Sequence, residues 1–426
     1  MDIVKMTMQF CGDIKWNHIL YDVRQGKSVS NTACCILIVG PRRMSNSMAE
    51  TDEVTFNREF RVVMRGPSAV IFRPGKNLLF EKFPTEFGPV NIGYASRWLK
   101  RAEAVTVPGH LWIEVRGCAP DLERAIGPFA NAGLVGVSII ATSANAAVGE
   151  PQVEVVFEST RGAKERDYFQ SYVPPETGVL HTGRLIDLPA TLAFLNSLKA
   201  HKDADRLLRA TSQYNLALEN WKFGHATMSL AHLWMAVEAL TRVKIRAESA
   251  ARGLSEPEEL AASLGIGLRD LDATIRRQFI LQGDTECYTQ AKEASDGFEH
   301  GYLGFDRLLE LSQQVRHRMA AYVRASIFDL AGVEENAKAR LLSSTFAEAL
   351  GHWPVVKYLR GTLRGDRDEL AAPGNEYPFM RWATGIKKCE FGEDGKLQVQ
   401  LEEKLTAELA DGISFSPKSF EAWRPD

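Results

Sequence analysis

A short acidic stretch that ends in a histidine holds the side chains best suited to chemistry. Asp296, Glu299 and His300 fall within five residues, with glycines at 297 and 301. On a helix, Asp296 and His300 are four residues apart and share a face. A carboxylate there orients the imidazole and raises its pKa, which prepares a general acid or base. The alternative is an ordinary helix end, where histidine favours the dipole and Gly301 terminates the helix.

A second carboxylate, Glu238, lies in a segment that is apolar on nearly every side of its expected helix. A buried carboxylate needs a cationic or hydrogen-bonding partner, and His300, Arg276, Arg206 or Arg209 could serve. The alternative is that Glu238 lies at the edge of the apolar stripe and is solvated.

The elements that position these residues fall into three expected parts. Residues 1–195 favour an α+β domain that acts as a recognition module, with a helix from Asp121 to about 131. A Gly66-Pro67 turn predicts a hairpin between two of its strands, 61–64 and 70–72. The strands expected from apolar runs and alternation are 33–39, 61–64, 70–72, 111–115, 135–141 and 153–157.

The middle part, residues 200–345, changes to helical periodicity and predicts an all-α antiparallel bundle with loops near Gly253, Gly283 and Gly301. Asp306 is expected to cap its last helix. The helices expected are 207–221, 230–241, one starting at 255–258, 268–281, 287–298 and 306–330. The last part, 346–426, predicts a small α+β appendage with a hairpin of strands 389–391 and 397–401. The fold class is therefore α+β.

The helical part resembles the HEPN superfamily, especially its Apea-like branch, over residues 203–333, about a third of the chain. The resemblance rests on DRLLRATSQYNLALENW ending at Trp221, on LAHLWMAVEALT (230–241), and on a helix that ends in His-Gly (300–301) before a long closing helix. The stretch EASDGFEHG (293–301) is also similar to methylamine-utilisation proteins of the MauJ type.

This resemblance implies an all-α bundle that forms a homodimer, and often a metal-independent ribonuclease of toxin or anti-phage systems. The family motif is R-x4-6-H, in which His transfers protons and Arg stabilises the phosphate. His300 matches the His, but the Arg positions hold Glu293, Ala294 and Ser295. A phosphate contact would then come from another cation, and the candidates are Lys292, Arg276, Arg277, Arg316 and Arg318.

Composition limits the partners. The chain of 426 residues has 51 Lys+Arg against 54 Asp+Glu, so a strongly basic nucleic-acid binder is not expected. Six cysteines without a C-x-x-C pair and nine dispersed histidines predict neither a disulfide framework nor a local metal site. The longest apolar runs, 33–39 and 133–141, are too short to span a membrane, and residues 1–5 do not start a signal peptide. A cytoplasmic protein without a cofactor is expected.

The leading functional hypothesis is a HEPN-like protein that lacks the standard ribonuclease motif. It would bind a nucleotide, RNA or a partner protein, and would dimerise through its helical bundle. One alternative is a ribonuclease effector with a rearranged active site, whose catalytic candidates are His300, Asp296, Glu299 and Glu238. Another alternative is an accessory factor in amine metabolism.

Overall fold

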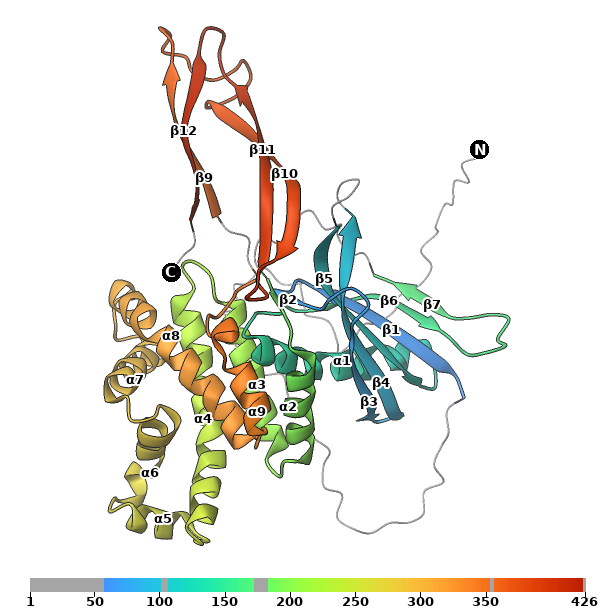
Figure 1. Cartoon of the computed structure of the whole chain (residues 1–426), viewed down its shortest axis with the longest axis vertical. Helices are drawn as coiled ribbons and strands as arrows, with labels where there is room; N and C mark the ends of the chain where they lie inside the picture. The colour runs from blue at the N-terminus through green and yellow to red at the C-terminus, as the bar shows by residue number, and fades with distance from the viewer. Residues whose placement is uncertain (1–56, 101–105, 172–182, 353–355, 424–426) are drawn as a thin grey trace. The chain divides into compact units, whose positions relative to one another are not determined.

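The computed structural model describes residues 57–100, 106–171, 183–352 and 356–423, which all belong to one unit of the chain, Ala49–Asp426. Helices and strands are both abundant, so the expected mixed α+β class is confirmed (Figure 1). The strand expected at 33–39 lies outside the described residues. The expected boundaries near 195 and 346 stay predictions.

An antiparallel sheet of six strands forms the first region, in the order β3-β4-β5-β1-β6-β7. Along β5, buried and more exposed residues alternate, as they do when one face of a sheet meets the core. The expected strands 61–64, 111–115 and 153–157 are confirmed within β1, β5 and β6. The strands are β1 (Glu59–Gly66), β3 (Leu78–Thr85), β4 (Gly88–Lys100), β5 (Thr106–Cys118), β6 (Gln152–Glu158) and β7 (Tyr168–Gln170).

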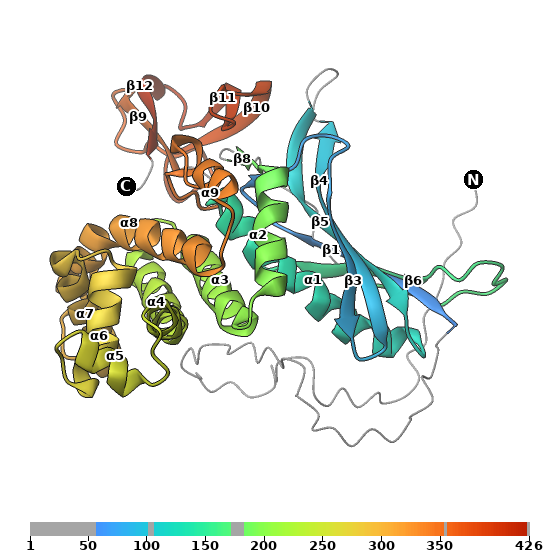
Figure 2. The same cartoon turned by 60° about the horizontal axis from the view of Figure 1, so that its bottom comes forward.

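Helix α1 (Leu122–Ala144) packs against one face of this sheet (Figure 2). Its start is as predicted, because the Asp121 side chain accepts a hydrogen bond from the backbone N–H of Arg124. A Cβ on Gly136 would lie 2.3 Å from the Tyr94 hydroxyl, so a glycine is needed for this close approach. The strand expected at 135–141 is wrong, since this run is the second half of α1. A short apolar run is compatible with a buried helix as well as a buried strand.

Helix α1 is long and apolar enough to cross a bilayer, judged by length and composition alone. However, 61% of its most apolar window is buried inside the described part of the protein. Such burial is typical of the core helix of a water-soluble protein.

The hairpin expected between 61–64 and 70–72 is also wrong. Strand β1 pairs with β5 and β6, whereas β2 (Val70–Ile71) pairs in parallel with β8 (Arg184–Leu185). The chain leaves β1 through Pro67, whose carbonyl accepts from the Gly149 N–H, and Ala69 then donates to Ala147. Both sides of β1 are therefore occupied, and β2 lies in a separate two-stranded sheet.

The helical region confirms the long helices predicted from periodicity. Helices α3, α4 and α8 pack on one another, and α2 and α3 contact α1. Asp306 is not the cap of α8, because the cap is Gly304 and Asp306 lies in the first turn. The segment expected as one helix over 268–281 combines a 3-10 turn, α6 and a π turn (Ile275–Ile280). The helices are α2 (Leu188–Ala200), α3 (Ala204–Glu219), α4 (Ala226–Ala251), α5 (Pro257–Ser263), α6 (Leu271–Thr274), α7 (Thr285–His300), α8 (Phe305–Leu330) and α9 (Glu335–Leu341).

Four strands form the last region. Strand β9 (Val356–Arg364) pairs with β12 (Ser414–Trp423), and β10 (Phe379–Phe391) pairs with β11 (Leu397–Glu408). The hairpin expected around 392–395 is confirmed, with Phe391 opposite Leu397. Its turn contacts β8, because Leu185 donates to the Gly395 carbonyl and Leu397 donates to Gly183.

Candidate functional site

The side chains expected to do chemistry at the end of α7 are near one another in the chain but do not form an acid–base pair. His300 is the last residue of α7 and is exposed, and Gly301 follows with φ of 66°. The Asp296 carboxylate forms an ion pair with Lys292, one turn earlier. Glu299 accepts a hydrogen bond of 3.4 Å from Ser295. Within the described residues, no hydrogen bond or ion pair joins His300 to either carboxylate.

Glu238 lies at the edge of the apolar stripe of α4, where 46% of its side chain is exposed. Its partner is Arg276, one of the cations considered for it, with Oε1 and Nη1 3.5 Å apart. The Arg276 guanidinium also donates to Thr241 Oγ1 over 3.1 Å and lies 5.6 Å from the Trp234 ring. This arrangement is that of a half-solvated ion pair, which contributes little to stability.

The cations expected to contact phosphate are engaged elsewhere or dispersed. Arg318 binds Asp284 and Glu286 at 3.1 and 3.2 Å. Arg316 is buried, with its guanidinium 4.9 Å from the Trp221 ring. Arg277 lies on the π turn that precedes α7. The described structure therefore does not gather these side chains into one anion site.

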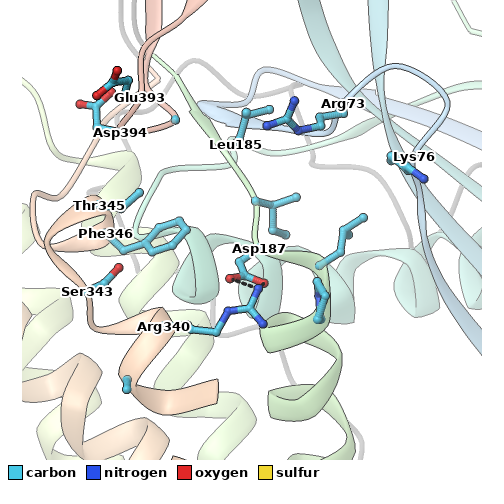
Figure 3. Close-up of a pocket in the computed structure, with 15 residues that line it drawn as sticks. Arg73, Lys76, Leu185, Asp187, Arg340, Ser343, Thr345, Phe346, Glu393 and Asp394 are labelled. Atoms are coloured by element: carbon cyan, nitrogen blue, oxygen red, sulfur yellow. Dashed lines mark hydrogen bonds and ion pairs between the residues drawn. The ribbon is translucent and has the colours of Figure 1, made fainter. Parts of the chain in front are cut away.

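A cavity of about 660 Å³ has both charged and apolar residues in its lining (Figure 3). Four segments meet there: the turn after β2, the start of α2, the end of α9 with the residues that follow it, and the β10–β11 turn. Its apolar lining residues are Leu185, Ile186, Leu188, Pro189, Ala339 and Phe346.

Two cations lie on the turn after β2. The Lys76 N–H donates to the Arg73 carbonyl over 2.9 Å, and Gly75 between them has φ of 72°. The Pro74-Gly75 pair supplies the backbone geometry that such a turn requires. Both cationic side chains are exposed, and neither forms an ion pair with any residue of the described ranges.

Two carboxylates lie on the β10–β11 turn, across the opening from Lys76 (Figure 3). The Asp394 side chain accepts a hydrogen bond of 3.1 Å from the Lys396 N–H, which holds the turn. Lys396 itself forms a 2.6 Å ion pair with Glu348, so its charge is not available to neutralise Glu393.

The wall between these two turns contains an ion pair of its own. Asp187 caps α2 by accepting from the Ala190 N–H over 3.1 Å, and its carboxylate is 2.7 Å from Arg340 Nη2. This pair links the start of α2 to α9 at the wall of the cavity. The lining of the cavity thus combines cations, carboxylates and apolar side chains. Such a lining suits the binding of a small molecule.

Sequence reasoning did not identify this cavity. The sequence predicts the hairpin turn at 392–395, yet nothing in it indicates the wall of a binding cavity. Asp187 and Arg340 are far apart in sequence and meet only in the fold.

A second group of residues, here called the Trp221 cluster, was also missed. Arg316 and His317 pack on the Trp221 ring, Glu219 precedes Trp221 by two residues, and His352 follows Gly351, which lies against the Trp221 carbonyl. Burial and the nearby Glu150 raise the pKa of Glu219 to about 7, although Lys222 acts in the opposite direction. Burial lowers the pKa of His352 to about 4. The His317 ring meets the Trp221 ring edge-on at 5.0 Å.

The described residues contain no group of three or more His, Cys, Asp or Glu that could hold a metal ion. No family model, curated protein or solved structure gives a significant match to the chain. The HEPN resemblance therefore rests on the sequence segments quoted for it.

Proposed function

We propose that the protein is a binding protein for a small molecule that carries both a negative and a positive group, held in the cavity of Figure 3. The observation that carries the proposal is a lining that combines two cations on one turn, Arg73 and Lys76, with two carboxylates on another, Glu393 and Asp394, and with apolar side chains. A volume of about 660 Å³ is within the range of small-molecule sites.

The charges of the cavity define the ligand. A carboxylate or phosphate pairs with Arg73 and Lys76 without breaking an existing described ion pair, whereas Arg340 is already bound to Asp187. An ammonium pairs with Glu393 or Asp394. A nucleotide brings several negative charges toward those two carboxylates, so an amino acid or an amine-bearing acid fits better.

This proposal develops the expected ligand-binding, HEPN-like protein of the cytoplasm, and it favours an amine-containing ligand over a nucleotide. A role as an accessory factor in amine metabolism is compatible with the acidic side of the cavity. Titrations that compare amino acids with nucleotides distinguish an amine-binding role from a nucleotide-binding role.

Thermal-shift titrations with amino acids, amine-bearing phosphates and nucleotides are expected to show stabilisation by a zwitterion. Replacing both Arg73→Gln and Lys76→Gln should weaken that ligand roughly 10- to 100-fold, since two charge-assisted contacts are lost. Lys164→Gln, an exposed lysine on the β6–β7 loop, is the matched control and should change nothing. Equal binding by the double variant and the wild type would contradict the proposal.

A second candidate is the ribonuclease effector, and the Trp221 cluster favours it over the α7 residues. Glu219, with a pKa of about 7, suits proton transfer at neutral pH, and Arg316 and His317 pack on the ring of Trp221, two residues after Glu219 in the chain. Metal-free protein should then cleave RNA, and Glu219→Gln should reduce the rate at least about 100-fold. His300→Ala should retain activity. No cleavage by the wild type across varied RNAs would eliminate this candidate.

Dimerisation through the helical bundle is likewise a proposal, implied by the HEPN resemblance. Three aromatic side chains at the α7–α8 turn offer a surface for it: Phe298, Tyr302 and Phe305 are 45%, 59% and 69% exposed. Light scattering that gives the monomer mass of 47.4 kDa at micromolar concentration would contradict it.

A further inference from the structure

The sheet carries a trough on the face opposite α1. Its floor is β4, where Gly93 and Ala95 have small or absent side chains. The strand register places Leu79 of β3 opposite Gly93 on one side, and Trp112 of β5 opposite Ala95 on the other. Two large apolar side chains therefore flank a stretch of β4 whose own side chains on this face are small or absent.

Burial confirms which way these residues face. Leu79 is 52% and Trp112 is 39% exposed, while their chain neighbours Leu78 and Ile113 are fully buried on the α1 side. The hollow between them measures about 300 Å³. It is separate from the cavity of Figure 3 and shares no lining residue with it.

Gly93 is not required by the backbone of the fold. Its φ is not positive, and an added Cβ would make an ordinary 3.5 Å contact with Leu79 Cδ2. Glycine inside a strand weakens the strand, and it commonly marks a place where a ligand approaches closely. The absence of a side chain at position 93 is thus better explained by a ligand that occupies the space than by the packing of the strands.

The polar groups of the trough define its occupant. Glu114 forms an ion pair with Arg61 at 3.3 Å, and Arg116 binds Glu59, so the charges are internally balanced. The uncharged amides Asn77 and Asn91 complete the lining. The Asn91 oxygen accepts from the Lys82 N–H over 3.1 Å, which leaves its amide N–H groups for another acceptor.

We propose that this trough binds an uncharged, flat heterocycle of the nucleobase or nucleoside class against the Trp112 indole. Stacking on tryptophan supplies the affinity, and carboxamides supply donors and acceptors for the edge of the ring. The balanced charges disfavour a phosphate-rich ligand. The proposal is independent of the function assigned to the larger cavity.

The test uses the full chain and titrations of adenosine, guanosine and uridine by saturation-transfer NMR. Gly93→Val fills the trough without removing any existing side chain, and valine suits a strand. Gly385→Val is the matched control, because that strand glycine lies in β10 with its nearest neighbour 3.7 Å from an added Cβ. Trp112→Leu removes the stacking surface.

We expect at least one nucleoside to bind the wild type with a Kd of about 1 mM or tighter. Gly93→Val and Trp112→Leu should weaken it at least about 10-fold, while Gly385→Val and the Arg73/Lys76 double variant should bind as the wild type does. Unchanged thermal unfolding verifies that each variant is folded. Equal binding by Gly93→Val, or no binding to the wild type, overturns the proposal. Self-association that Gly93→Val abolishes would also overturn it, because a second copy would then occupy the trough.

Discussion

Replacing Arg324 with methionine is expected to lower the free energy of unfolding by about 4 kcal/mol or more. Arg324 is 2% exposed on α8, and its guanidinium donates to the carbonyls of Thr142, Ser143, Leu341 and Phe346 over 2.7 to 3.2 Å. Burial lowers its pKa to about 10, so the side chain stays charged at neutral pH. Methionine retains most of the volume but leaves these buried acceptors without their donor.

The position of Arg324 explains the size of this effect. Two of its acceptors are terminal carbonyls of α1, where the helix dipole places partial negative charge. Arg184, fully buried, donates to the next carbonyls, those of Ala144 and Asn145, at 2.9 and 3.3 Å. Two buried guanidiniums thus hold the end of α1 beside the residues that follow α9.

Urea unfolding followed by circular dichroism measures the change. Arg242→Met is the control, because Arg242 is 52% exposed and its ion pair with Asp272 spans 3.5 Å. The control should change stability by less than about 1 kcal/mol. A loss of the same small size for Arg324→Met would show that its hydrogen bonds to the carbonyls are not important for the fold.

The second large expected effect is a pH dependence of the free energy of unfolding. It becomes visible when either Glu219 or His352 is replaced alone. The folded-state pKa of Glu219, about 7, lies above its ordinary value of 4.5. Its contribution to stability is complete below pH 4.5 and is lost as pH rises through 7. The folded-state pKa of His352, about 4, lies below its ordinary 6.5. Its contribution is complete above pH 6.5 and is lost as pH falls through 4.

Between pH 4.5 and 6.5 these two contributions oppose each other, so the wild-type profile should be nearly flat with respect to this pair. Glu219→Gln should expose the His352 contribution, with stability falling on acidification by up to about 1.4 kcal/mol per pH unit. His352→Gln should show the opposite slope. Glu150 and Lys222 are the other charges that act on Glu219 and remain in both variants.

Urea unfolding at half-unit steps from pH 4.5 to 8 tests this pair. Glu165→Gln, an exposed carboxylate on the β6–β7 loop, should reproduce the wild-type profile. Parallel profiles for the wild type, Glu219→Gln and His352→Gln would mean that neither group titrates differently in the folded state.

The elements that sequence reasoning predicted well are those with long periodic patterns. The apolar residues of α3 repeat over sixteen residues, and a helix of that length has no competing interpretation. The run 135–141 is only seven residues long, and its apolar character reflects burial against the sheet, which a helix provides as well as a strand does. Strand β2 has two residues, and only its parallel partner β8, more than a hundred residues later, defines it.

The candidate site was unpredictable for a related reason. His300 attracted attention because acidic neighbours surround it in the chain, yet the Asp296 carboxylate binds Lys292 instead. The cavity collects Lys76, Asp187, Arg340 and Asp394 from segments scattered over more than three hundred residues. Each is an ordinary charged residue in its local sequence, and only the tertiary fold brings them to one cavity.

The most direct test of the binding proposal is calorimetric titration of the best zwitterion from the thermal-shift panel into three proteins. These are the wild type, Arg73→Gln with Lys76→Gln, and Glu393→Gln with Asp394→Asn. The proposal predicts that each pair of substitutions weakens the zwitterion roughly 10-fold or more. It also predicts that an analogue without the ammonium loses affinity for the wild type but is insensitive to the Glu393/Asp394 pair. Affinities that are the same for all three proteins would contradict the assignment of this cavity as the ligand site.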